Sequence, residues 1–162
     1  MQQDEYRIRP YAPSDRVACL GLFDSNTPDF FASRERDEFG RFLDGPDATM
    51  LVLETSGGEL IGCGGHYVRS ESMGGGLAWG MVARSWHRRG AGRTLLCSRL
   101  AALHAAGVRS VTVHTSQHSR GFFEREGFEE VRMAPDGFAP GLDMVELRLQ
   151  PVFRNHPVSR MF

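Results

Sequence analysis

A short glycine-rich segment flanked by arginines carries the clearest chemical signal in this chain of 162 residues. It runs from Arg88 through Gly90 and Gly92 to Arg93, between a strand-like apolar run and a helix-like one. Glycines leave backbone N–H groups accessible, and the first N–H groups of a helix have no intrahelical partner, which favours a bound anion. Arginine adds charge-assisted, often bidentate hydrogen bonds. The segment therefore predicts a site for a phosphorylated ligand.

The composition around this segment narrows the class of ligand. Arg84, Arg88, Arg89 and Arg93 fall within ten positions, where an even spread of the 19 basic residues would give about one. A dinucleotide-binding turn has the pattern G-x-G-x-x-G, and Leu95 stands where its third glycine belongs. The chain contains no lysine, which excludes a P-loop and a lysine-bound pyridoxal phosphate. A tight turn with solvated arginines is the alternative interpretation.

Charge and cysteine content exclude further classes. The net charge is −1 and the isoelectric point is about 6.6, which disfavours a general nucleic-acid binder. Cys19, Cys63 and Cys97 are odd in number and widely spaced, so neither a metal cluster nor a disulfide framework is expected, and a reducing, cytoplasmic setting fits. The polar start of the chain and the lack of about 18 consecutive apolar residues predict neither a signal peptide nor a membrane span.

Hydrophobic periodicity and turn residues predict the elements that position the glycine-rich segment. We expect one domain over residues 1–150, with the order β-α-α-β-β-β-α-β-α-β-β, and a tail over residues 151–162. Ser14, Ser33 and Ser119 are expected helix caps, and residues 74–76 and 135–141 are expected breaks between strands. The strands are expected at 6–9, 50–53, 60–68, 77–82 with a bulge at Gly80, 111–113, 128–133 and 144–149, and the main helices at 15–23, 34–43 and 93–106.

Two motifs in this order resemble the GNAT superfamily of acyl-CoA-dependent N-acetyltransferases. Residues 87–92, HRRGAG, are similar to the family's loop Q/R-x-x-G-x-G/A between its fourth strand and third helix, with His87 departing from the first position. Residues 119–128, SRGFFEREGF, are similar to the family's A-x-x-F-Y-x-x-x-G-F run, which leads from a helix into a strand. The expected element order also resembles the family's over about residues 5–149.

The resemblance implies a mixed α/β fold with a largely antiparallel central sheet and helices on both faces. The sheet would splay between its fourth and fifth strands, and the pantetheine arm of acetyl-CoA would lie in that slot. The pyrophosphate would bind the amides of the glycine-rich turn. The two phenylalanines at 122 and 123 would flank the pantetheine, with core packing as their other role. The cofactor-binding residues implied are Met81, Val82, Ala83, Arg88, Arg89, Gly90, Ala91, Gly92, Arg93, Thr94, Phe122 and Phe123.

The chemical step leaves the proton donor and the base open. A backbone N–H of Met81 or Val82 is expected to polarise the thioester carbonyl. Many family members use a tyrosine as the acid, and Phe123 stands in its place, so the hydroxyl of Ser119 or Ser116, or a solvent molecule, would serve instead.

The candidate strand at residues 77–82 contains no carboxylate base. His114 and His118 are then the nearest titratable candidates, with His66 and Tyr67 weaker, and hydrogen-bonded or exposed histidines are the alternative. No residues have convincing spacing for a metal site.

The acceptor is expected opposite the cofactor slot, between residues 23–31 and residues 135–143. The leading hypothesis is transfer of acetyl from acetyl-CoA to a primary amine of a small molecule or peptide, by direct attack in a ternary complex. An acyl-CoA-binding module without turnover and a nucleotide-binding domain are the alternatives, and a homodimer is possible. Candidates for attracting the amine are Asp24, Asp29, Asp136 and Asp143, and candidates for an apolar wall are Phe23, Phe30, Phe31 and Phe138.

Overall fold

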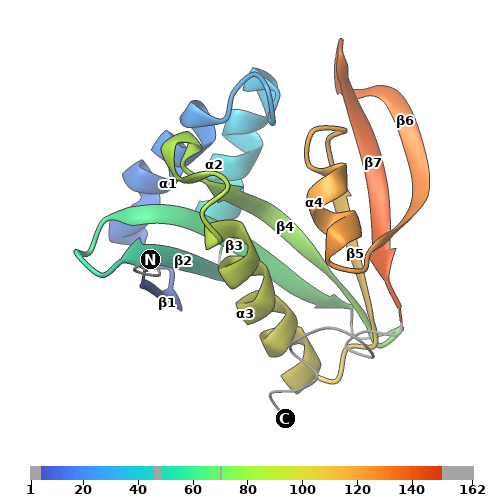
Figure 1. Ribbon diagram of the computed structural model, residues 1–162, viewed down its shortest axis with the longest axis horizontal. Coiled ribbons are helices and arrows are strands. Elements are labelled where there is room, and N and C mark those ends of the chain that lie inside the picture. The colour runs from blue at the N-terminus through green and yellow to red at the C-terminus, as the bar shows by residue number, and fades with distance from the viewer. Residues whose placement is uncertain (1–4, 46–48, 70, 151–162) are drawn as a thin grey trace.

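The computed structural model describes residues 5–45, 49–69 and 71–150, so the expected tail at 151–162 lies outside the described residues. Seven strands form one sheet in the order β1-β2-β3-β4-β5-β7-β6 (Figure 1). No helix in these ranges is long and apolar enough to span a membrane. The strands are β1 (Tyr6–Pro10), β2 (Met50–Thr55), β3 (Leu60–Arg69), β4 (Gly74–Val82), β5 (Ser110–Thr115), β6 (Glu129–Ala139) and β7 (Leu142–Leu149).

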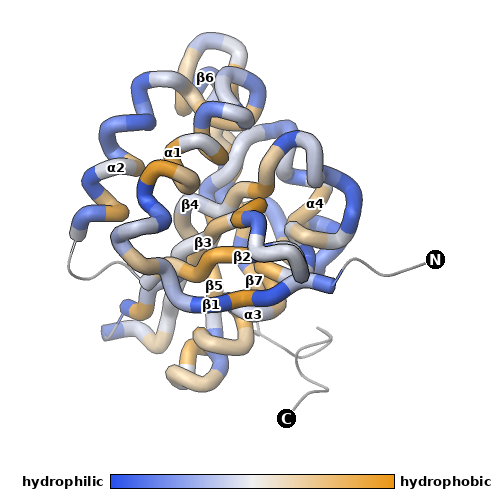
Figure 2. The backbone as a smooth tube through the Cα atoms, turned by 90° about the vertical axis from the view of Figure 1, so that its left-hand side faces the viewer, coloured by the Kyte–Doolittle hydropathy of each residue, from blue (hydrophilic) through white to orange (hydrophobic). Residues whose placement is uncertain are grey.

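Helices cover both faces of the sheet, as expected from the resemblance (Figures 1 and 2). Phe23, Phe39 and Leu43 pack on one face against Val52 and Cys63. A second cluster, rich in leucine and valine, joins α3 and α4 to β5 and β7 on the other face. Figure 2 shows the apolar residues gathered along the central strands. The helices are α1 (Arg16–Ser25), α2 (Arg36–Asp44), α3 (Ala91–Ala105) and α4 (Arg120–Arg125), with 3-10 turns η1 (Pro13–Asp15), η2 (Ser33–Glu35) and η3 (Arg84–Trp86).

The parallel pair β4–β5 opens the sheet. All other neighbouring strands are antiparallel, whereas β4 and β5 pair in parallel only from Gly74 opposite Ser110 to Leu77 opposite Val113. No residues beyond Leu77 and Val113 pair between the two strands, which shows that the strands diverge there. The expected splay between the fourth and fifth strands is confirmed.

β4 contains a β-bulge shortly after Leu77, the last residue that pairs with β5. Cys63 pairs with Met81 and Gly65 with Ala78, so one residue of β3 faces two residues of β4, Trp79 and Gly80. Trp79 has a φ of 55°, a left-handed conformation that a bulky side chain rarely adopts. The expected bulge at this position is confirmed, and it turns the end of β4 toward the opening in the sheet.

The first of two expected breaks is wrong and the second is shorter than expected, because residues 74–76 and 135–139 belong to strands and only residues 140–141 form a turn. Residues 74–76 begin β4, and Gly76 lies under the ring of Tyr67, where a Cβ would come within 2.3 Å of ring atoms. Close packing, not chain reversal, explains that glycine. β6 continues through Pro135 to Ala139. Proline is tolerated there because β6 is an edge strand, which leaves N–H groups unpaired on one side.

Two of the three expected serine caps are also wrong, and the third, Ser119, occupies the N-cap position of α4. Ser14 and Ser33 lie inside 3-10 turns, and Ser119 precedes α4 without a capping hydrogen bond from its side chain. Carboxylates serve the first two helices instead. Asp15 and Glu35 each reach back to accept the backbone N–H three residues earlier, at 2.8 Å in both cases. A longer acidic side chain therefore takes the role expected of a hydroxyl.

Candidate functional site

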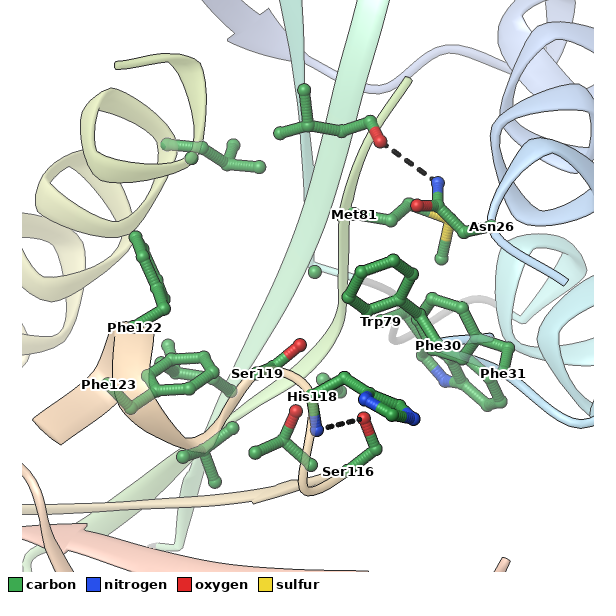
Figure 3. A pocket seen from close by; sticks show the side chains of 18 of the residues that line it. Asn26, Phe30, Phe31, Trp79, Met81, Ser116, His118, Ser119, Phe122 and Phe123 are labelled. Atoms are coloured by element: carbon green, nitrogen blue, oxygen red, sulfur yellow. Dashed lines mark hydrogen bonds between the residues drawn. The ribbon is translucent and has the colours of Figure 1, made fainter. Parts of the chain in front are cut away.

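A cleft of about 1500 Å³ lies where β4 and β5 diverge. Its two walls are visible in Figure 3, with Phe122 and Phe123 of α4 on one side and Trp79, Phe30 and Phe31 on the other. The N-terminus of α3, η2 at the start of α2 and the tip of the β6–β7 hairpin complete the lining. Segments that are distant in the sequence thus meet at the opening of the sheet.

The glycine-rich turn leads into the N-terminus of α3 and exposes its amides. Gly90 has a φ of 83°, and α3 begins at the next residue. Thr94 donates its N–H to the carbonyl of Gly90 at 3.0 Å, which leaves the N–H groups before it without an intrahelical acceptor. At Gly92 the nearest atoms to a Cβ would be those of the Phe122 ring, 3.6 Å away, so the approach is open. The turn therefore has the geometry of an anion site.

Two of the four clustered arginines make ion pairs in this conformation. Arg84 reaches Asp29 at 2.6 Å, and Arg93 reaches Glu126 at 3.0 Å. Both pairs are largely exposed on the arginine side, and such pairs exchange readily for a stronger anion. Both arginines line the cleft.

The other two arginines lie on the turn itself. Arg88 has a φ of 61° and lines the cleft. The guanidinium of Arg89 stacks 3.8 Å above the ring of Trp86, and Arg89 is not among the residues that line the cleft. The backbone carbonyl of Arg89 accepts a hydrogen bond from the hydroxyl of Tyr6 at 2.7 Å. Ala83, Ala91 and Thr94 are likewise outside the lining, so their contacts with the cofactor stay predictions.

The backbone at the end of β4 faces the cleft at Val82. Ala83 donates its N–H to Ile61 across the β3 ladder at 2.7 Å. Because successive residues of an antiparallel strand alternate in direction, the N–H and carbonyl of Val82 point away from β3. The carbonyl is held by the amide of Asn26 at 2.9 Å and lies 2.9 Å from Nε2 of His87 (Figure 3). The N–H of Val82 is left directed into the opening.

This geometry distinguishes Met81 from Val82, which the sequence analysis left as equivalent candidates for polarising the thioester carbonyl. Met81 occupies the ladder position opposite Cys63, so its backbone groups serve the pairing of β3 with β4. His87, the residue that departs from the family's loop pattern, ties that loop to the end of β4. Asn26 was missed, and its position at the C-terminal end of α1 was the one available signal, since asparagine often ends helices.

All four predicted catalytic side chains lie on one wall, at the end of β5 and the start of α4. Ser116 is 2 % exposed, and its hydroxyl accepts the N–H of His118 (Figure 3). His114 is hydrogen-bonded to Glu146 at 2.8 Å. His118 packs edge-on against Phe30 across the cleft, and Ser119 begins the turn into α4. The structure thus brings these residues together without assigning a role to any of them.

The phenylalanines at 122 and 123 both line the cleft and differ in burial. Phe123 is 8 % exposed and packs edge-on against Phe122 and Phe128, at centroid distances of 5.0 and 5.3 Å. Phe122 is half-buried and faces the start of α3. Both expected roles, lining and packing, therefore coexist at this wall, and no hydroxyl is present at either position.

The acids expected on the acceptor side are used elsewhere. Asp24 pairs with Arg36 at 2.8 Å, Asp29 with Arg84, and Asp136 and Asp143 bond backbone groups of their own hairpin. None of the four lines the cleft. Among the expected aromatic residues, Phe30, Phe31 and Phe138 do line it, whereas Phe23 is buried in the core at 1 % exposure.

Two other carboxylates face the acceptor side. Glu35 and Glu38 line the cleft from η2 and α2, and Trp79 and Tyr67 line it as well. Burial raises the pKa of Glu35 above its usual value, although its carboxylate also accepts the N–H of Ala32. The sequence analysis missed this pair. The spacing of three residues on a charged helix was the available signal, since it places both on one face.

Comparison with known proteins supports this geometry. The model of the acetyltransferase (GNAT) domain family matches residues 24–151. None of the curated proteins compared with the chain matches it. A GCN5-related N-acetyltransferase from Kribbella flavida is 19 % identical, with a TM-score of 0.74 over 90 % of this chain and 97 % of that one.

Two further solved structures are similar in fold. The ribosomal-protein-S18-alanine N-acetyltransferase from Escherichia coli is 16 % identical, with a TM-score of 0.75 over 91 % of this chain and 94 % of that one. YncA from Salmonella typhimurium, solved with its cofactor acetyl-CoA, is 16 % identical, with a TM-score of 0.70 over 90 % and 94 %. At these identities the likeness extends to the fold alone.

Proposed function

Because the chain belongs to the GNAT family of acetyltransferases, we propose that it moves the acetyl group of acetyl-CoA to a primary amine by direct attack in a ternary complex. One observation carries the proposal: the cleft joins an anion-binding helix N-terminus to an acidic, aromatic chamber through the opening between β4 and β5. A donor entering at α3 and an amine entering beside η2 would meet at the bulge of β4.

The residues present fit acetyl-CoA in both charge and shape. The free amides at the start of α3, with Arg88 and Arg93, would hold the pyrophosphate. The pantetheine arm would pass between Phe122 and the end of β4, where Val82 directs its N–H into the cleft. When bound, the thioester supplies the activated acetyl group, and the Val82 N–H would polarise its carbonyl.

The acceptor side favours a cationic amine. Glu35 and Glu38 would attract the ammonium group, and the rings of Trp79 and Phe31, stacked with centroids 6.3 Å apart, would cover its apolar part. The raised pKa of Glu35 suits it to accept the proton that the ammonium must lose before attack. His118 on the opposite wall is the other candidate for that role.

Calorimetry with acetyl-CoA tests the cofactor part of this proposal. We expect sub-millimolar binding to the native chain, weakened about tenfold to a hundredfold in the double variant Arg88→Ala/Arg93→Ala, because two charged contacts near the phosphates are lost. Arg41→Ala, which removes an exposed arginine of α2 outside the cleft lining, is the matched control. Absence of binding by the native chain would refute the proposal.

Release of free thiol across a panel of amines tests turnover. An acyl-CoA-binding module without turnover is the second candidate, favoured by Phe123 in place of the expected tyrosine. Such a module would bind the cofactor and release no thiol above background. We also propose a cytoplasmic setting, an acceptor amine on a small molecule or a peptide, and a homodimer. The three free cysteines agree with the cytoplasmic setting.

A further inference from the structure

Arg99 is buried at the centre of the molecule beneath the bulge of β4. It projects from α3 and is 3 % exposed, yet it is among the residues that line the cleft. Two glycines make room for its guanidinium. A Cβ at Gly64 would lie 2.8 Å from its Cζ, and a Cβ at Gly80 would lie 2.8 Å from one Nη. A buried cation therefore lies directly beneath the bulge of β4.

The charge of Arg99 has no carboxylate partner among the described residues. One Nη donates to the carbonyl of Gly65 at 3.2 Å, and the buried Nε has no hydrogen-bond partner. The titratable groups that interact electrostatically with it are Cys63 and His66 on β3. A hydrogen bond with Cys19 and burial raise the pKa of Cys63, while burial lowers the pKa of His66. Both neighbours are therefore neutral at neutral pH.

Arg99 itself stays protonated under the same conditions. Burial lowers its pKa to about 10, which still leaves the guanidinium charged near pH 7. A buried charge without a counter-ion is costly, and apolar residues of similar volume commonly replace such groups without loss of stability. Tyr67, His118 and Glu35 also line the cleft, and none of them forms an ion pair with Arg99. The surroundings thus leave a net positive charge directed at the bulge.

We propose that Arg99 stabilises the negative charge that the reaction places on sulfur, and so compensates for the absent tyrosine. This inference rests on the proposed function. The amine nitrogen bonds to the acyl carbon, the carbon–sulfur bond breaks, and its electron pair stays on sulfur. The amine proton passes to a base or to water, and the thiolate takes up a proton from water afterwards. Arg99 is a positioning residue, because it acts on the sulfur through the electrostatic field of its charge at Gly80 and not through direct contact.

The pKa of the thiol of bound CoA tests the inference without turnover. The thiolate is followed by ultraviolet absorbance against pH, and the same titration with a CoA analogue that lacks sulfur is subtracted to remove the cysteines of the protein. In Arg99→Met the thiol pKa should rise by about one unit, because a single charge acting over roughly 10 Å at an effective dielectric constant near 20 shifts a pKa by about that much. Arg99→Lys keeps the charge and should retain most of the native value.

The outcomes separate this inference from the proposed function. If the native chain fails to bind CoA, the proposed function is wrong. If CoA binds the native chain and Arg99→Met with similar affinity and shows the same thiol pKa in both, the role of Arg99 is wrong and its charge is merely structural. Should Arg99→Met not fold, Arg99→Gln, which can keep the hydrogen bond to Gly65, is judged by the same criterion.

Discussion

Removal of the Asn26 side chain should loosen the contact that holds α1 against the end of β4. The residue is 2 % exposed, and its amide donates to the carbonyls of Leu22 and Val82, both at 2.9 Å. A buried neutral hydrogen bond contributes about 1 kcal/mol, so Asn26→Ala loses about 2 kcal/mol for the two. Both carbonyls keep another polar neighbour, Ser25 for Leu22 and His87 for Val82, which holds the cost near that value.

The expected shift in melting temperature follows from chain length. Unfolding entropy of about 2.1 cal/mol/K per residue gives about 0.3 kcal/mol/K for a chain of 162 residues, so 2 kcal/mol lowers the melting temperature by about 6 °C. Differential scanning calorimetry measures the shift. Val17→Ala on the same helix is the control, because Val17 is 82 % exposed and its loss should cost less than about 0.5 kcal/mol.

The same variant should also affect ligand binding. With the Val82 carbonyl held by His87 alone, the Val82 N–H is less firmly directed, and affinity for acetyl-CoA should fall a few-fold, about 1 kcal/mol. A melting temperature equal to that of the native chain would show that the two hydrogen bonds contribute nothing measurable. A lower melting temperature with unchanged affinity would retain the structural argument and refute the functional one.

Two further variants test carboxylates whose pKa values are shifted. Glu35→Gln keeps an oxygen for the Ala32 N–H, so its melting temperature should stay within about 2 °C of the native value. Its kcat/KM should fall about a hundredfold, and the acid limb of the pH profile of kcat/KM should disappear. An unchanged pH profile would exclude Glu35 as the base. A hydrogen bond from Arg9 lowers the pKa of Asp15, so the stability it contributes is present above about pH 4 and lost at lower pH. Asp15→Asn should therefore melt lower than the native chain at pH 7, and the difference should shrink as the pH falls below about 4; a difference that does not shrink would contradict this.

Local signals in the sequence were sufficient for the order of the elements. Apolar alternation and helical spacing depend on side chains within a few residues of each other. These two patterns predicted every helix and strand in the order in which the structure has them. The expected break at residues 74–76 was wrong and the one at 135–141 was too long, because glycine and proline also occur inside strands. Gly76 makes room for a ring on the neighbouring strand, and Pro135 lies on an edge strand, facts that depend on pairing.

The glycine-rich turn was likewise predictable, since its chemistry is local. Consecutive amides at a helix start bind anions through the geometry of one turn, which the residues from Arg88 to Arg93 encode without help from the rest of the chain. The acceptor side was different. Asp24 and Asp29 were expected there, and each instead pairs with an arginine, a partnership set by how α1 packs.

By itself, the sequence determined the element order, the anion-binding turn and, through two motifs, the family. Only the tertiary structure decided which groups share the cleft. Strand register directs Val82 rather than Met81 into the opening, and helix packing brings Arg99 under Gly80 and Glu35 toward the same chamber. Periodicity is a property of neighbours along the chain, whereas register, burial and charge compensation depend on neighbours in space.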